Sequence, residues 1–190
     1  MNTVRARSIV LEPQVADHAK EMFVVLSDPA IYEFENFPPE SQTALERRYA
    51  ALECRASPDS GEHWLNWVIR LPTGELAGYV QATIARDGPA KIAYELGSRF
   101  WRRGIGTAAV TTMLDELAGT YGVRFVMAIL KARNYRSLGL LQKMGFAEAG
   151  PGSLPGVQLE SDELVMVKGL GESAPTAAKT SSGFIAVPET

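Results

Sequence analysis

The feature that most constrains the fold of this chain is a change of pattern between residues 63 and 132. Residues 63–98 contain three strand-like runs, and the turn signal Pro72-Thr73-Gly74 separates the first two. A helical pattern follows over 106–122, and an apolar run then covers 123–132. Successive strand-like runs predict an antiparallel meander. The order strand, helix, strand predicts a βαβ unit with parallel strands, so the chain should fold around one mixed α/β sheet.

The flanking segments add helices and strands to this core. Helical spacing over 14–29 and 41–56 places apolar residues on one face of each segment, and Ser41 is a suitable N-cap. The run over 123–132 is apolar at nearly every position, so we expect both of its faces to be covered. Gly122, just before it, is expected to cap the preceding helix. We also expect an edge strand over 5–13, a short helix over 136–144 and a last strand over 162–170.

Length and composition limit the classes of protein. With 190 residues, the chain suits one well-cored domain over 1–170, followed by a small, polar, proline-bearing tail over 171–190. A net charge of −3 argues against nucleic-acid binding. The single cysteine, Cys54, permits no internal disulfide, and two histidines make a zinc site unfavourable, so we expect no metal. Without a signal-peptide core or a run of membrane-spanning length, a cytoplasmic protein is the expectation.

Arginines and glycines gather where the helix over 106–122 begins. The stretch "FWRRGIGTAA" holds Arg102, Arg103, Gly104 and Gly106. Glycines let a backbone turn tightly and approach a ligand closely. Arginines and the unpaired N–H groups of a helix N-terminus attract phosphate. The stretch therefore predicts a loop that binds a phosphorylated molecule.

A dinucleotide-binding loop is one interpretation of these glycines. The spacing Gly104-x-Gly106-x-x-Ala109 fits the relaxed fingerprint of that class. The context does not fit, because five residues separate the loop from the preceding strand. An acidic residue is also missing about twenty positions further on, where Arg124 stands. An oxidoreductase selective for NADP remains the less favoured alternative.

The other interpretation rests on resemblance to a known family. "WRRGIGTAAV" resembles the acyl-CoA pyrophosphate loop of the GNAT (GCN5-related) N-acetyltransferase superfamily, with Trp101 at the position where that pattern usually has Gln or Arg. Downstream, "NYRSLGLLQKMGF" (134–146) resembles that superfamily's N-x-x-S/A-x-x-x-x-x-K-x-G-F segment. "VLSDPAIYEFENFPPES" and "AYELGSRFWRRGIGT" are similar to the branch of Rim-type ribosomal-protein N-acetyltransferases. The resemblance extends from about residue 5 to 170 and implies the GNAT fold, a mostly antiparallel sheet with one splayed parallel pair and flanking helices.

The resemblance also implies how acetyl-CoA would bind. The pantetheine arm would pair with the free edge of the strand that ends at 95–98, and the pyrophosphate would lie on the amides of 103–108. Asn134 would contact the pantetheine amides and Ser137 would lie near the thiol. From the residues alone, Asn134 is equally suited to cap the helix that follows. The implied cofactor-binding residues are Leu96, Gly97, Ser98, Arg102, Arg103, Gly104, Ile105, Gly106, Thr107, Ala108, Asn134 and Ser137.

The catalytic groups are less clearly indicated. Many members of the superfamily carry a tyrosine acid four positions after that serine, where this chain has Leu141. The proton donor for the thiolate is then Ser137, a water molecule or none, since a thiol with a pKa near 8.5 leaves tolerably unaided. A carboxylate near the acceptor is suited to take a proton from the amine. Glu33, Glu35 and Glu95 are the candidates, each with a structural role as the alternative.

The expected activity is transfer of an acetyl group from acetyl-CoA directly to a primary amine, either a peptide N-terminus or a small molecule. No covalent intermediate is expected, because Cys54 lies outside both motif blocks. The absent tyrosine leaves a noncatalytic acyl-CoA-binding or regulatory module as the main alternative. Similar folds often form dimers, so a homodimer is also expected.

Overall fold

The computed structural model describes residues 1–171 except for residues 35, 58–60, 86–88, 151–153 and 155–156. All but the first residue of the expected tail thus lies outside the described residues. These residues form one mixed α/β sheet of eight strands in the order β1-β2-β3-β4-β5-β6-β8-β7. The strands are β1 (Val4–Arg5), β2 (Val10–Pro13), β3 (His63–Arg70), β4 (Leu76–Ile84), β5 (Ala90–Leu96), β6 (Phe125–Lys131), β7 (Ala147–Glu148) and β8 (Glu163–Gly169).

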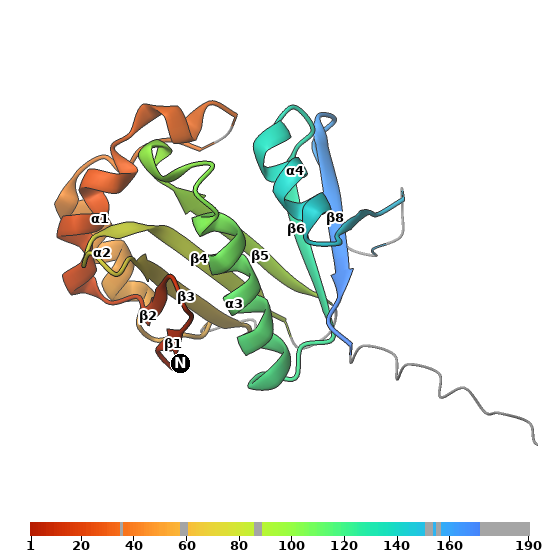
Figure 1. Cartoon of the computed structure of the whole chain (residues 1–190), viewed down its shortest axis with the longest axis horizontal. Coiled ribbons are helices and arrows are strands. Elements are labelled where there is room, and N and C mark those ends of the chain that lie inside the picture. The colour runs from red at the N-terminus through yellow and green to blue at the C-terminus, as the bar shows by residue number, and fades with distance from the viewer. Residues whose placement is uncertain (35, 58–60, 86–88, 151–153, 155–156, 172–190) are drawn as a thin grey trace, which may run out of the picture.

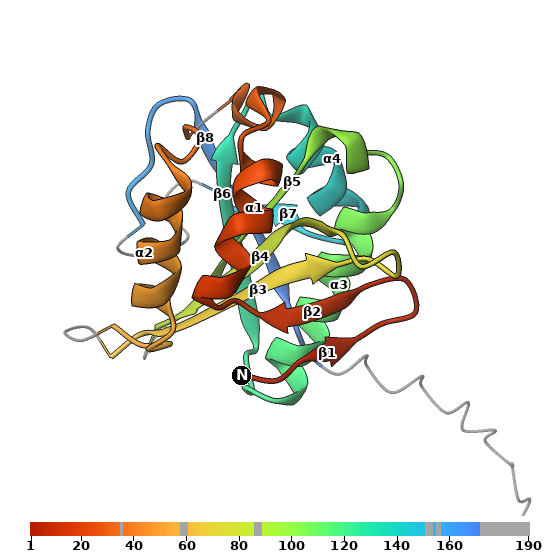
Figure 2. The same ribbon diagram turned by 90° about the vertical axis from the view of Figure 1, so that its left-hand side faces the viewer.

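Helices cover both faces of the sheet. On one face α1 (Ala19–Leu26) and α2 (Gln42–Leu52) bury residues such as Met22 and Tyr49 against β3 and β4. On the other face α3 (Ile105–Gly119) packs Val110 and Met113 into the larger core, which also includes Leu141 of α4 (Tyr135–Lys143). Figure 2 shows α1 and α2 in front of the sheet and α3 behind it. Three 3-10 turns complete the chain: η1 (Ala16–His18), η2 (Pro29–Tyr32) and η3 (Ser98–Phe100).

The sheet opens between its only parallel neighbours among the described strands, β5 and β6. Their Cα partners are Ala90 with Val126 and Lys91 with Met127. Beyond this point β5 stays paired with β4 as far as Leu96, whereas β6 stays paired with β8 as far as Lys131. The two strands therefore diverge into a V, visible in Figure 1 between β5 and β6.

The predicted meander and βαβ unit are confirmed. Strands β3, β4 and β5 pair antiparallel in sequence order, and β5, α3 and β6 form the parallel unit. The predicted N-cap is confirmed as well, since the Ser41 hydroxyl accepts a hydrogen bond from the Ala44 N–H at 3.1 Å. These elements depend on local pattern and turn chemistry, which the sequence carries directly.

Three expectations need correction. The run over 5–13 forms two short strands, β1 and β2, that pair with each other. The expectation that β6 is covered on both faces is wrong: Phe125 is 64% exposed, because α1 and α2 pack on β3 and β4 and leave one face of β6 open. Helix α3 ends at Gly119 with Thr120 as its C-cap, and Gly122 adopts its positive φ of 65° two residues later.

A glycine decides how closely β4 approaches the end of β5. Gly78 is opposite Leu96, the last residue of β5. A Cβ added at Gly78 would lie 2.0 Å from the carbonyl oxygen of Glu95. Because real Cβ atoms do not come so close to a backbone oxygen, only glycine fits there. Gly78 thereby fixes the end of the strand that borders the V.

Candidate functional site

The divergence of β5 and β6 creates a cavity with a volume of about 1090 Å³. Its lining comes from β5, β6, α4 and the loop before α3, and also from α2 and the segment 31–40. Both Tyr94 and Glu95 line it, although neighbouring residues of a strand point to opposite faces of a sheet. The cavity therefore connects the two faces of the sheet through the gap.

The start of α3 forms one end of this cavity. Gly104 is the N-cap with φ +77°, and Arg102 also has a positive φ, of 58°. The first helical bond runs from the Ala108 N–H to the Gly104 carbonyl at 3.0 Å, so the amides of residues 105–107 have no partner within the helix. Neither Arg102 nor Arg103 forms an ion pair with another described residue. This end of the helix is thus suited to bind an anion. Ala108, predicted to offer its amide, uses it inside the helix.

The free edge of β5 is shorter than predicted. The Gly97 N–H donates to the Ala77 carbonyl at 3.0 Å, and the Ser98 N–H donates to the Asp28 carboxylate at 2.8 Å. Since backbone groups alternate sides along a strand, the N–H of Leu96 points away from β4, toward the gap. The predicted edge over 95–98 therefore reduces to Leu96, because the amides of Gly97 and Ser98 are already paired.

Trp101 occupies the position where the family pattern usually has Gln or Arg. Its indole Nε1–H donates to the Leu96 carbonyl at 2.9 Å. The bond ties the loop before α3 back to the end of β5. The bond occupies one lone pair of that carbonyl. It leaves the Leu96 N–H, on the same side of the strand, available to another partner. The loop is therefore held by a side chain of its own.

Two groups meet at the start of α4. The Asn134 side-chain oxygen accepts from the Ser137 N–H at 3.1 Å, so the capping role is confirmed. The Tyr94 hydroxyl, reaching across from β5, donates to the Ser137 carbonyl at 3.4 Å. Burial raises the pKa of Tyr94 to about 12, so this phenol stays protonated at neutral pH. The sequence alone did not assign a role to Tyr94. Tyr94 is two residues from Ile92, so the strand pattern places both side chains on one face of β5. The pattern does not show that the gap between β5 and β6 opens beside Tyr94.

On the opposite face, two uncharged donors contact Glu95. The Tyr79 hydroxyl hydrogen-bonds to its carboxylate, and the Asn36 Nδ2 donates to its Oε1 at 3.4 Å. Burial is the largest cause of the raised pKa of Tyr79, and the Glu95 charge adds to it. The pKa of Tyr32 is raised for the same two reasons. Glu95 thus faces the cavity as a carboxylate whose tyrosine neighbours remain neutral.

The other two candidate bases differ from Glu95. The Glu33 carboxylate forms an ion pair with Arg136 at 2.7 Å, and Glu35 lies outside the described residues. Arg136, to which the sequence alone assigned no role, stacks 4.4 Å above the centre of the Trp101 ring and lies 5.3 Å from the centre of the Phe34 ring. These contacts join the segment 31–40 to α4 across the mouth of the V.

The structure brings together some of the predicted site residues and leaves others outside the cavity. Gly97, Ser98, Arg103, Ile105 and Ala108 do not line it, and Ile105 is buried in the core. The described residues contain no group of three His, Cys, Asp or Glu side chains placed to hold a metal ion. No helix in the described part of the chain is long and apolar enough to cross a membrane. The predicted residues that line the cavity are Glu95, Leu96, Arg102, Gly104, Gly106, Thr107, Asn134 and Ser137.

Comparison with known proteins agrees with this geometry. A family model of the acetyltransferase (GNAT) domain matches residues 8–147. The uncharacterized N-acetyltransferase YoaA of Bacillus subtilis (strain 168) is 24% identical over 141 residues, which are 72% of this chain and 78% of YoaA.

Two solved structures share the fold. RimL, the ribosomal L7/L12 alpha-N-protein acetyltransferase, solved with coenzyme A, has a TM-score of 0.70 at 16% identity over 88% of this chain and 97% of its own. The microcin C7 self-immunity acetyltransferase MccE, solved with acetyl-CoA and AMP, has a TM-score of 0.70 at 19% identity, and the match covers 86% of this chain and 93% of MccE. At identities of 16% and 19%, the structural similarity establishes the shared fold alone.

Proposed function

Because the chain belongs to the acetyltransferase (GNAT) family and is an acyl-CoA-dependent acetyltransferase, we propose that it transfers acetyl from acetyl-CoA directly to a primary amine. The amine belongs to a peptide N-terminus or a small molecule. The observation that carries the proposal is the cavity through the gap between β5 and β6, which joins an anion-binding helix start to a carboxylate on the opposite face. The name of RimL, an alpha-N-protein acetyltransferase, supports the first class of acceptor.

The cofactor side is built mainly from backbone. We assign the pyrophosphate to the unpaired amides of residues 105–107 at the end of the cavity. Arg102, which lines the cavity, and the neighbouring Arg103 add charge-assisted contacts. The space beside Gly104 fits this assignment, since a Cβ placed there meets nothing within 4 Å. The pantetheine arm would pair with the Leu96 N–H, and the Asn134 side chain would contact its amides. When bound, acetyl-CoA supplies the activated acetyl group.

The chain's own residues then handle two protons. Attack by the neutral amine forms a C–N bond and breaks the C–S bond of the thioester. Glu95 accepts the proton that the amine loses, in keeping with general-base catalysis. We place the proton donor for the departing thiolate at Tyr94, whose hydroxyl lies at the start of α4, with Ser137 as the neighbouring alternative. The N-terminus of α4 further stabilises negative charge on the sulfur.

Thermal unfolding with acetyl-CoA, coenzyme A or NADPH tests the proposal first. Acetyl-CoA at 100 times its Kd should add about 2.7 kcal/mol to the free energy of unfolding. At roughly 2–4 °C per kcal/mol, the melting temperature should rise by several degrees. Arg102→Ala combined with Arg103→Ala breaks no ion pair among the described residues, so it should weaken this response without destabilising the free protein. Gly104→Val is less suitable, because the φ of +77° strains any larger residue.

Thiol release with a panel of amines then separates the alternatives. Turnover with any primary amine supports the acetyltransferase. Binding of acetyl-CoA without turnover would point to the noncatalytic acyl-CoA-binding module. A response to NADPH alone would overturn the proposal in favour of the oxidoreductase.

A further inference from the structure

A row of three carboxamides crosses the sheet on the α1–α2 face. The Gln14 N–H donates to the Asn66 carbonyl at 2.9 Å, and Asn66 is the Cα partner of Gln81. The side chains of Asn66 and Gln81 lie on the same face as Tyr79 and Glu95, because Gln81 is two residues from Tyr79 on β4. All three carboxamide residues line the cavity. The row therefore forms part of the cavity wall on the α1–α2 face.

Polar groups in this region lack partners. Gln14, Asn66 and Tyr49 are only 3%, 5% and 4% exposed. Within the described part of the chain, the Gln14 Nε2, the Asn66 Nδ2 and the Tyr49 hydroxyl have no hydrogen-bond partner, and neither has the Nη1 of Arg55, a residue that does not line the cavity. Buried polar groups without partners are rare in folded proteins, because each loses its bonds to water without replacement. All of these groups can donate a hydrogen bond, and the tyrosine hydroxyl can also accept one. Together they favour oxygen atoms that accept hydrogen bonds.

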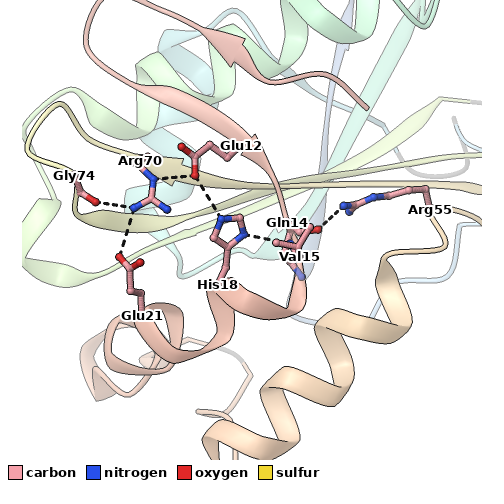
Figure 3. Close-up of polar contacts among 8 residues, drawn as sticks. All are labelled: Glu12, Gln14, Val15, His18, Glu21, Arg55, Arg70 and Gly74. Carbon is pink, nitrogen blue, oxygen red and sulfur yellow. Dashed lines mark hydrogen bonds and ion pairs between the residues drawn. The ribbon is translucent and has the colours of Figure 1, made fainter.

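The position of Gln14 is fixed by its own backbone. Its N–H is bonded to Asn66, and its carbonyl accepts from the Arg55 guanidinium, which Figure 3 shows reaching it from the end of α2. The next turn is fixed too, since the Val15 N–H donates to His18 Nδ1 at 3.2 Å. Burial lowers the pKa of His18, which keeps this acceptor nitrogen unprotonated at neutral pH. The backbone at Gln14 therefore cannot shift easily to find a partner for the side chain.

We propose that this row is an acceptor subsite that binds amide carbonyl oxygens of an extended amine substrate; the inference rests on the proposed function. Glu95, the proposed base, marks where the amine reacts. Strand spacing of about 4.8 Å and a rise of about 3.3 Å per residue place Gln81 about 8 Å from Glu95 and Asn66 about 12 Å from it. The substrate thus carries its oxygens about 8–12 Å from its amino group.

This distance selects among amines. The carboxylate of a free α-amino acid lies within about 4 Å of its amino group and cannot reach the row. An extended peptide spans about 3.3–3.6 Å per residue, so the carbonyls of its second and third residues do reach it. The donors of the row itself are neutral and favour a neutral carbonyl, because an isolated carboxylate loses more hydration on burial. Arg48 is the charged residue of α2 that also lines the cavity. The structure therefore assigns a peptide-like, amide-bearing acceptor.

A graded set of acceptors tests the subsite. We would measure kcat/KM by thiol release at saturating acetyl-CoA for ω-amino amides, ω-amino acids and n-alkylamines of increasing length. The amide-to-alkylamine ratio should peak at about tenfold or more with about five to eight methylene groups, the length that spans 8–12 Å. It should stay near one with two methylene groups. An equal or larger peak for the ω-amino acids would overturn the assignment of a neutral carbonyl.

Two variants locate the effect. Asn66→Leu and Gln14→Met remove one unpaired donor each and nearly keep its shape, so the free protein should be as stable as the wild type or more so. Asn66→Leu should lower the peak ratio toward one. Gln14 lies one strand further, about 16 Å from Glu95 by the same spacing, so Gln14→Met should lower the ratio only for acceptors with about eleven methylene groups. Gln42→Met, on the exposed start of α2 and outside the cavity lining, is the matched control and should leave the peak in place.

The possible outcomes separate the two proposals. Transfer to all amines with no dependence on the amide or its distance would overturn the subsite and leave the acetyltransferase standing. Loss of the peak in Gln42→Met as well would also overturn the subsite. Binding of acetyl-CoA without transfer to any amine would overturn the proposed function, and the subsite with it.

Discussion

The two faces of the sheet build their halves of the cavity in different ways. On the α3–α4 face the contacts assigned to the cofactor come mostly from backbone: the amides of residues 105–107, the Leu96 edge and the turn at Gly104. On the α1–α2 face they come from side chains on distant segments, among them Gln14, Asn66 and Glu95. A site built from backbone groups requires only glycines, a turn and a helix start, so a short sequence motif predicts it. A site built from side chains on different strands requires those strands to pair in one register, and no short motif predicts that register.

Gly78→Ala should have the largest effect, because it disturbs the strand end that both halves share. The new Cβ would lie 2.0 Å from the Glu95 carbonyl oxygen, so β4 and β5 must separate. We expect the free energy of unfolding to fall by about 3 kcal/mol or more, measured by urea denaturation. Gly74→Ala is the control, since it has a positive φ but no atom within 4 Å of the new Cβ. It should lose only about 1–2 kcal/mol. Equal losses would mean that the close approach at Gly78 does not matter.

Glu95→Gln separates the two faces by function. It keeps the shape of the side chain and removes the proposed base, so kcat/KM for the amine should fall about a hundredfold or more. Stabilisation by acetyl-CoA should not change, because that half of the site is backbone. Glu40→Gln, another carboxylate that lines the cavity, is the control and should stay within about twofold of wild type. Wild-type activity in Glu95→Gln would remove Glu95 from the mechanism.

Tyr94→Phe probes the one side chain on the cofactor side that we assign to chemistry. Loss of the hydroxyl should lower kcat about tenfold, with little change in the KM for acetyl-CoA. The effect is modest because a thiol is an adequate leaving group without an acid. Ser137→Ala, measured in parallel, identifies the donor: a loss confined to that variant would assign the proton to Ser137.

Gly139→Ala should have the smallest effect on stability and the opposite sign. Gly139 lies inside α4, lines the cavity and has no atom within 4 Å of an added Cβ. Alanine should stabilise the free protein by about 0.5–1 kcal/mol, since glycine is unfavourable in a helix. Stabilisation by acetyl-CoA should fall, because the methyl group enters the cavity. Gly119→Ala in α3, also without contacts but outside the cavity, should leave the response to acetyl-CoA unchanged. An unchanged response in Gly139→Ala would place the cofactor away from this helix face.

The sequence by itself determined the parts of this protein that depend on local pattern. The meander, the βαβ unit, the Ser41 and Asn134 caps and the GNAT family were predictable from periodicity, turn residues and two motif blocks. Each of these features depends either on residues close together in the chain or on backbone hydrogen bonds that form with nearly any side chain.

Only the tertiary structure decided which groups share the cavity. It paired the amides of Gly97 and Ser98 within the fold, engaged Glu33 with Arg136, and placed Tyr94 beside the start of α4. It also aligned Gln14, Asn66 and Gln81 in one row. These relations join residues tens of positions apart. They follow from strand register and from the angle at which β5 and β6 diverge, and both are set by the packing of the whole sheet.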